Sequence, residues 1–154
     1  MLEQSLRVFT RRVGELLDAE RASLFLVDRE RQQLVLRVAQ DMPEGDYVRI
    51  PLGSGIAGAA AMSGEVVRVD DAYADPRFNQ AVDAETGFHT RSMLCLPLQD
   101  RSGAVFAVTQ LLNRRDGRPF DEQDTHRYAE LASSLSVLLE SLVKLGRTAA
   151  RRAP

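Results

Sequence analysis

The stretch VDAETGFHTRSMLCLPL, residues 82–98, joins a polar half to an apolar half. Its second half, residues 92–98, is a run of mostly large apolar side chains, which predicts a buried strand. Its first half, residues 83–90, carries carboxylates, hydroxyls and a glycine, as a surface turn or the wall of a polar pocket would. Both interpretations stay open from this stretch alone.

The residues around this stretch predict a mostly antiparallel sheet. Residues 104–112, AVFAVTQLL, follow residues 92–98 after the short turn DRSG, a pattern typical of a hairpin. In residues 33–39 the alternation of Leu34, Leu36 and Val38 predicts one apolar face. Six strands are expected in all, at residues 22–28, 33–39, 47–52, 65–70, 92–98 and 104–112.

Helical spacing marks both ends of the chain. In residues 1–20 the apolar side chains recur every three or four residues, at Leu2, Leu6, Phe9, Val13 and Leu16. A second helix is expected at residues 122–146. Asp121 directly before it is a good N-cap, and Gly146 is expected to end it before a basic tail or linker at 147–154. This helix is more apolar than one sheet face requires, so a partner helix or chain is expected. Its apolar rows are Tyr128, Leu131, Leu135, Leu138, Leu142 and Leu145, widened by Val137, Leu139 and Val143.

The element order predicts a single α+β domain at residues 1–146. The terminal helices are expected on one face of the six-stranded, mostly antiparallel sheet, and residues 53–90 on the other. This middle segment has many small residues and little regular pattern, so it would cover the sheet incompletely and leave a ligand cavity.

Composition excludes several classes of function. The 154 residues are 44% hydrophobic and 27% charged with a net charge of −2, which does not favour nucleic acid. The single cysteine, Cys95, excludes an internal disulfide and a thiolate metal cluster, and its apolar surroundings predict a buried, inert thiol. No apolar run is long enough to span a membrane, so a cytoplasmic protein is expected. No catalytic set stands out, and we expect neither enzyme activity, cofactor nor metal.

Two segments could bind a small polar ligand. The glycines of GSGIAG, residues 53–58, either form a tight turn or let the amides of Ile56 and Ala57 approach an anion. On a helical turn, Asp83, Thr86 and Thr90 would share one side, because they are three and four residues apart.

Four segments together resemble a GAF domain over about residues 1–146: ASLFLVD (22–28), IPLGSGIAG (50–58), the stretch 82–98 and LLNRRDGRPFDEQD (111–124). The form of TGFHTRSMLCLPL is similar to cyclic-nucleotide-binding GAF domains of phosphodiesterases and bacterial adenylyl cyclases. The resemblance implies a GAF/PAS-like fold. It also implies ligand contacts and a supporting motif. The implied contacts are Ser23, Ile56, Ala57, Asp83, Thr86, Thr90 and Gln110, and the supporting motif is Asn113, Arg114, Phe120 and Asp124.

The sequence departs from that pattern at four positions. Ala39 aligns where many members stack an aromatic ring on the purine, and Gln110 where some carry glutamate. In the motif Arg114 replaces lysine, which keeps the charge and allows an ion pair with Asp124, and Thr125 replaces glutamate. Bilin attachment and methionine-sulfoxide reduction are excluded, because they need a loop cysteine and several cysteines respectively.

The resemblance implies a regulatory sensor domain that binds a cyclic nucleotide, with cAMP favoured over cGMP. Such a domain would pass its signal through the terminal helices to an unknown effector, as a homodimer. The alternative is a GAF domain without nucleotide binding, which acts in dimerisation or signal relay or binds another small molecule.

Overall fold

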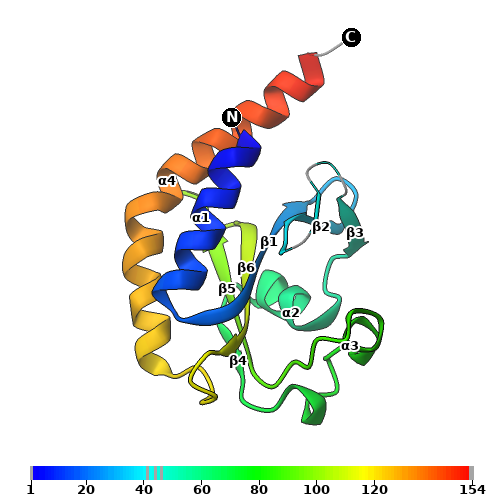
Figure 1. Cartoon of the computed structure of the whole chain (residues 1–154). Coiled ribbons are helices and arrows are strands. Elements are labelled where there is room, and N and C mark those ends of the chain that lie inside the picture. Colours follow the sequence, from blue (N-terminus) through cyan, green and yellow to red (C-terminus); the bar gives the residue numbers. More distant parts are fainter. Residues whose placement is uncertain (1, 41, 44, 46, 153–154) are drawn as a thin grey trace.

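The protein is one six-stranded antiparallel sheet between two helical layers (Figure 1). This computed structural model describes residues 2–40, 42–43, 45 and 47–152. The strand order across the sheet is β3-β2-β1-β6-β5-β4, so the first and the last long strands are neighbours at its centre. The strands are β1 (Ala19–Asp28), β2 (Gln33–Val38), β3 (Val48–Pro51), β4 (Val67–Val69), β5 (Met93–Gln99) and β6 (Val105–Arg114).

The terminal helices α1 (Leu2–Leu16) and α4 (Glu122–Arg152) pack side by side on one face of the sheet (Figure 1). The apolar stripe of α1 buries Leu6, Phe9 and Val13 against this face. From α4, Leu139 and Val143 join the same core. The predicted α+β layering is therefore confirmed on this side.

The opposite face is covered by α2 (Gly55–Ser63), with Ala72 of a 3₁₀ turn η1 (Ala72–Ala74) in the same core. The short helix α3 (Gln80–Thr86) lies on this side too, farther from the sheet than α2 (Figure 1). Small residues allow α2 to lie close to its preceding loop. A Cβ on Gly58 would come within 2.2 Å of the backbone of Gly53, so only glycine fits there. The predicted middle layer is thus present, with more helix than expected.

Several predicted boundaries are wrong. Helix α1 ends at Leu16, not at residue 20, because Asp18 adopts a left-handed backbone with φ 54° and β1 already begins at Ala19. As a result Leu17 is buried, whereas Leu16 is 47% exposed.

Helix α4 does not end at Gly146 but continues to Arg152, so most of the expected basic tail is helical. A glycine inside a helix costs only about 1 kcal/mol relative to alanine, which a 31-residue helix tolerates. Residues 153–154 lie outside the described residues. Among the described residues, no helix has the length and apolar character to cross a membrane.

The expected common face of Leu34, Leu36 and Val38 is also wrong. The register of β1 and β2 shifts between Leu24 and Phe25, so β2 contains one extra residue. This bulge leaves Leu34 in the core under α2 and moves Val38 into the core under the terminal helices.

Candidate functional site

A row of polar side chains crosses the centre of the sheet beneath α2. Ser23 on β1 pairs with Gln110 on β6, which in turn pairs with Cys95 on β5. The Cys95 thiol lies 3.6 Å from the Gln110 side-chain oxygen and donates to it. Because these positions follow the alternation of Phe25 and Val108 on the same face, the row interrupts an otherwise apolar surface.

The start of α2 lies over this face of the sheet. Ile56 and Ala57 are 2% and 3% exposed and pack in one core with Cys95. The N-cap residue Ser54 makes no capping bond with its side chain. The structure therefore brings Ser23, Gln110, Ile56 and Ala57 to one side of the sheet, as the family resemblance implies.

Asp83 and Thr90 form a second polar group, in which they hydrogen-bond to each other and Asp83 also bonds to Tyr73. Asp83 accepts from the Thr90 backbone N–H at 2.7 Å and from the Thr90 hydroxyl at 2.8 Å. It also accepts from the Tyr73 hydroxyl at 2.7 Å. Both residues are buried, at 8% and 1% exposure. Asp83 thus fastens α3 to the loop before β5 and to η1.

The expected side-by-side arrangement of Thr86 and Thr90 is wrong. Helix α3 ends at Thr86, because Gly87 takes the left-handed conformation of a helix C-cap. Thr86 is exposed, and its hydroxyl donates to the Val82 carbonyl within the same helix. Thr90 lies beyond the helix and faces Asp83, so the two threonines do not converge.

Asp83→Asn should lower the free energy of unfolding by about 1–2 kcal/mol at pH 7, since it replaces a carboxylate that accepts three hydrogen bonds. Burial alone would raise the pKa of Asp83, but the bonds from Thr90 and Tyr73 outweigh it and hold that pKa below its ordinary value. A lowered folded-state pKa adds stability above the unfolded pKa of about 3.9, and this is lost as pH falls through the folded pKa.

The difference between wild type and Asp83→Asn should therefore shrink below pH 4 in urea unfolding. Glu85→Gln on the same helix is the matched control, because Glu85 is exposed. A difference that is equal at pH 7 and in acid would contradict this role for Asp83.

The Asn113 side chain on β6 hydrogen-bonds to the loop that carries Thr90. Its side-chain oxygen accepts from the backbone N–H groups of Arg91 and Ser92 at 2.6 and 3.1 Å. Its amide donates to the His89 carbonyl at 2.9 Å and to Glu20 at 3.0 Å. This bond from Asn113, ahead of the opposing effect of burial, lowers the pKa of Glu20. The implied supporting role of Asn113 thus has a geometric basis.

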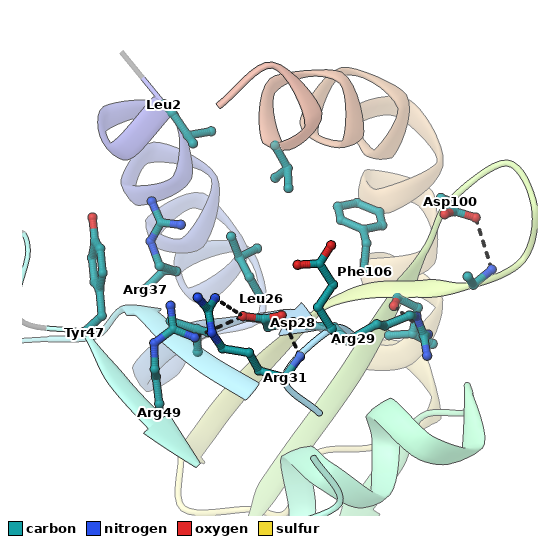
Figure 2. A pocket seen from close by; sticks show the side chains of 16 residues that line it. Leu2, Leu26, Asp28, Arg29, Arg31, Arg37, Tyr47, Arg49, Asp100 and Phe106 are labelled. Atoms are coloured by element: carbon teal, nitrogen blue, oxygen red, sulfur yellow. Dashed lines mark hydrogen bonds and ion pairs between the residues drawn. The ribbon is translucent and has the colours of Figure 1, made fainter. Parts of the chain in front are cut away.

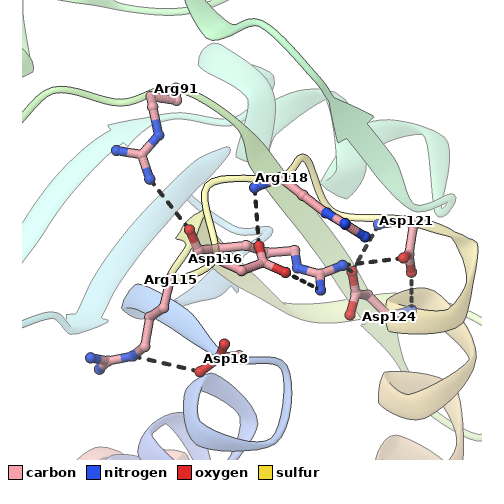
Figure 3. Close-up of polar contacts among 8 residues, drawn as sticks. Asp18, Arg91, Arg115, Asp116, Arg118, Asp121 and Asp124 are labelled. Atoms are coloured by element: carbon pink, nitrogen blue, oxygen red, sulfur yellow. Dashed lines mark hydrogen bonds and ion pairs between the residues drawn. The ribbon is translucent and has the colours of Figure 1, made fainter.

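Three carboxylates, those of Asp116, Asp121 and Asp124, lie close together near the start of α4 (Figure 3). All three form ion pairs with Arg114. Its guanidinium lies 2.7 Å from Asp116, 3.1 Å from Asp121 and 3.2 Å from Asp124. Asp121 and Asp124 also accept from each other's backbone N–H, which is a reciprocal helix cap. The expected Arg114–Asp124 pair and the capping role of Asp121 are confirmed. Phe120, the remaining motif residue, is 2% exposed in the core under the helices.

Of three hollows among the described residues, none is lined by Ser23, Ile56, Ala57 or Gln110. One of about 440 Å³ lies outside α3 and is lined by Tyr73, Asp83 and His89 among others. The largest, of about 640 Å³, lies at the far end of β1 and β2 (Figure 2). A third, of about 300 Å³, lies between α4 and β5. The expected open cavity over the polar row is therefore absent among these three.

Cys95 is fully buried, as the sequence predicts. Burial raises the pKa of its thiol well above the usual range, so the thiol is protonated at neutral pH. Its inertness towards thiol reagents stays a prediction. No group of three described His, Cys, Asp or Glu side chains is placed to hold a metal ion.

Sequence reasoning missed Tyr73 and Glu20, which hold Asp83 and Asn113. Tyr73 lies in a segment without periodicity, and its ring stacks on His89 at 4.9 Å, a contact that no spacing rule predicts. Glu20 could have been noticed as a carboxylate where an apolar strand begins. Ala39 follows β2 directly and is half-buried, so it offers no ring for stacking.

Known proteins of related sequence include cyclic-nucleotide phosphodiesterases. The dual 3′,5′-cyclic-AMP and -GMP phosphodiesterase 11 of Drosophila melanogaster is 41% identical over 127 residues, covering 73% of this chain and 9% of the fly protein. The probable 3′,5′-cyclic phosphodiesterase pde-5 of Caenorhabditis elegans is 40% identical over 122 residues, covering 71% of this chain and 16% of that protein. The chain thus spans a small part of these relatives.

Solved structures share the fold. The GAF domain of a phosphoenolpyruvate-protein phosphotransferase from Coxiella burnetii superimposes with a TM-score of 0.77 at 23% identity, over 97% of this chain and 86% of that one. A free methionine-R-sulfoxide reductase from Neisseria meningitidis gives 0.72 at 26% identity, over 97% and 81%. Residues 1–139 match the family model of the GAF domain. The chain therefore belongs to the GAF domain family.

Proposed function

We propose that this GAF domain is a regulatory sensor that binds a cyclic nucleotide over the polar row of the sheet. The observation that carries the proposal is the Ser23–Gln110 pair, which places two hydrogen-bonding side chains on an apolar sheet face beneath the start of α2. Ser23 and Gln110 are half-buried, and the Gln110 oxygen already accepts from the Cys95 thiol. Partly desolvated polar groups gain from further partners, which a polar ligand would supply. The identity to phosphodiesterases over most of the chain supports the same ligand class.

The start of α2 suits the phosphate of such a ligand. Free backbone amides and the helix dipole favour an anion at a helix N-terminus, and Ile56 and Ala57 lie in the first turn of α2. Gln110 would bond the base or ribose from below. Because the polar row lines none of the three hollows, the ligand needs room that the segments on this side of the sheet, from α2 to the loop before β5, must give.

In this proposal Asp83 and Thr90 hold α3 and the loop before β5 in place beside the nucleotide site. Their hydrogen bonds are made to each other and to Tyr73, and a ligand that moves α3 would exchange some of them for its own contacts. We favour cAMP over cGMP, because the stretch 82–98 resembles GAF domains of bacterial adenylyl cyclases. Without a stacking ring at Ala39, affinity should be modest, as stacking on a base is worth about 1–3 kcal/mol.

A ligand at about 100 times its Kd should stabilise the domain by about 2.7 kcal/mol, which raises the melting temperature by about 5–10 °C. The test is a thermal-shift titration with cAMP and cGMP. Ser23→Ala with Gln110→Leu should remove most of the shift and leave the unliganded melting temperature within a few degrees. Thr86→Ala is the matched control, since Thr86 is exposed and bonds within its own helix. No shift with either nucleotide at millimolar concentration would refute the proposal.

The proposal includes a homodimer through the terminal helices. Helix α4 exposes Val137, Leu138 and Leu145, of which Leu138 is 60% and Leu145 66% exposed. The last two are seven residues apart and so lie on one face of the helix. Light scattering at micromolar concentration should give a dimer mass, and Leu138→Glu a monomer mass. Val82→Glu, at a 53% exposed valine on α3, should stay dimeric. A monomeric wild type would overturn this part.

The alternative is a GAF domain that relays signals without a nucleotide, which is favoured by the fact that Ser23 and Gln110 line none of the three hollows described above. The thermal-shift titration separates the two. A reductase activity is not proposed, because the chain has one cysteine and it is buried. The proposal also includes a cytoplasmic location, which an unpaired cysteine supports.

A further inference from the structure

The largest of the three hollows described above contains none of the residues of the proposed nucleotide site. Its volume is about 640 Å³, within the range of small-molecule sites. It lies where α1 begins, beside the later part of α4 and the hairpin of β1 and β2 (Figure 2). It therefore touches both terminal helices as well as the sheet.

Apolar side chains form the side of this hollow that faces the helices. Leu26 and Phe106 come from the two central strands and are 5% and 7% exposed. Leu2 of α1 and Val143 of α4 complete this wall. A ligand there would replace water against hydrocarbon, which favours an apolar molecular body.

Arginine side chains form the opposite side. The Arg31 and Arg49 guanidinium groups both lie 3.1 Å from one oxygen of Asp28, so two positive charges share one carboxylate. Burial alone would raise the pKa of Asp28, but its bonds to Arg31 and Arg49 keep that pKa below the ordinary value. Arg49 is 46% exposed along its side chain and can turn towards a ligand.

Arg37 contributes a third guanidinium group. It forms an ion pair with Glu3 and lies 4.3 Å above the ring of Tyr47. Its Nε is buried without a hydrogen-bond partner. A fourth arginine, Arg29, donates at 3.0 Å to a neutral acceptor, the Val105 carbonyl. Four arginines thus line the hollow together with the carboxylates of Asp28, Glu30 and Asp100, while Glu3 beside the hollow neutralises Arg37.

We propose that this hollow is a second ligand site, which binds a small amphiphilic monoanion: a carboxylate on an apolar body. The guanidinium fork matches a carboxylate in two parallel hydrogen bonds, and the apolar wall lies beyond it. A ligand that contacts Leu2 and Val143 would bridge α1 and α4. This proposal does not depend on nucleotide binding, because the two sites share no residue.

The test is isothermal titration calorimetry with decanoate, decylammonium and acetate. Decanoate should bind at one molecule per chain, at least tenfold tighter than either other probe, because it alone has both the charge and the chain. Arg49→Gln should weaken decanoate about tenfold, as expected for one lost charge-assisted bond. Arg68→Gln is the matched control, since Arg68 is an exposed arginine on β4 outside the hollow.

Leu2→Trp gives an independent check, because a bulky ring at half-exposed Leu2 should fill the apolar wall and block decanoate. Circular dichroism must show that each variant keeps its unliganded melting temperature within a few degrees. Decylammonium binding as tightly as decanoate, or decanoate binding unchanged in Arg49→Gln, would overturn the proposal.

Discussion

Asn113→Ala should lower the free energy of unfolding by about 3–4 kcal/mol, because several buried groups lose their partner at once. The Asn113 side chain uses both donors and both acceptor positions, and the residue is fully buried. Its removal leaves the amides of Arg91 and Ser92 and the His89 carbonyl without that partner. Urea unfolding at neutral pH is the measurement.

Two further variants separate the effect of the lost hydrogen bonds from the effect of backbone strain. Asn113 has a φ of 56°, where alanine is strained and glycine is not. Asn113→Gly should therefore recover about 1 kcal/mol and leave most of the loss. Gln32→Ala is the matched control, because exposed Gln32 has nearly the same φ of 52°. If Asn113→Ala costs no more than Gln32→Ala, the network contributes little.

Removal of the Asn113 hydrogen bonds should also disturb the residues beside the proposed nucleotide site. Thr90 lies between two residues that Asn113 holds, and Thr90 in turn holds Asp83. Sequence alone could predict that Asn113 supports the fold, through the family resemblance, but not which loop it supports. Its partners lie 21 to 93 residues away, and the antiparallel pairing of β6 with both β5 and β1 brings them together.

Periodicity predicted the elements whose burial is simple. The apolar run 92–98 became β5, and the stripe through Leu6, Phe9 and Val13 became the buried face of α1. Prediction failed where one extra residue reverses which side chains of a strand face each side of the sheet, as at the β2 bulge that moves Val38 to the other core. It failed again at Thr86, because Gly87 ends α3 before a helical turn can reach Thr90. A local conformational choice decides these cases, and hydrophobic spacing does not reveal it.

The candidate site shows the same limit. Ser23 and Gln110 could be placed on strands, and their pairing follows from the strand order. The closed group of Tyr73, Asp83 and Thr90 could not be foreseen, because η1 and α3 are short and lack an apolar rhythm. The stretch that raised two interpretations satisfies parts of both: Asp83 and Thr90 are buried, and Thr86 is a solvated helix end.

Arg114→Met should lower the free energy of unfolding by about 3 kcal/mol, because it leaves the Asp124 carboxylate buried without its cation. The Asp124 side chain is 3% exposed, whereas Asp116 and Asp121 are 39% and 53% exposed. Pairs of exposed charges contribute little, so nearly all of the loss should come from Asp124. Burial opposes the charge on Arg114, yet the three carboxylates raise its pKa, so the guanidinium stays charged at any pH of interest.

Urea unfolding of Arg114→Lys tests whether stability depends on the shape of the guanidinium group or on its positive charge alone. Lysine is the residue that the family motif carries, but an ammonium group lacks the fork that reaches three carboxylates, so about half of the loss should remain. Arg118→Met is the matched control on the same loop, because Arg118 is exposed, and it should change stability by less than about 0.5 kcal/mol. An Arg114→Met variant as stable as Arg118→Met would mean that Asp124 is held by the Asp121 backbone N–H alone. The reciprocal cap, and not the arginine, would then fix the start of α4.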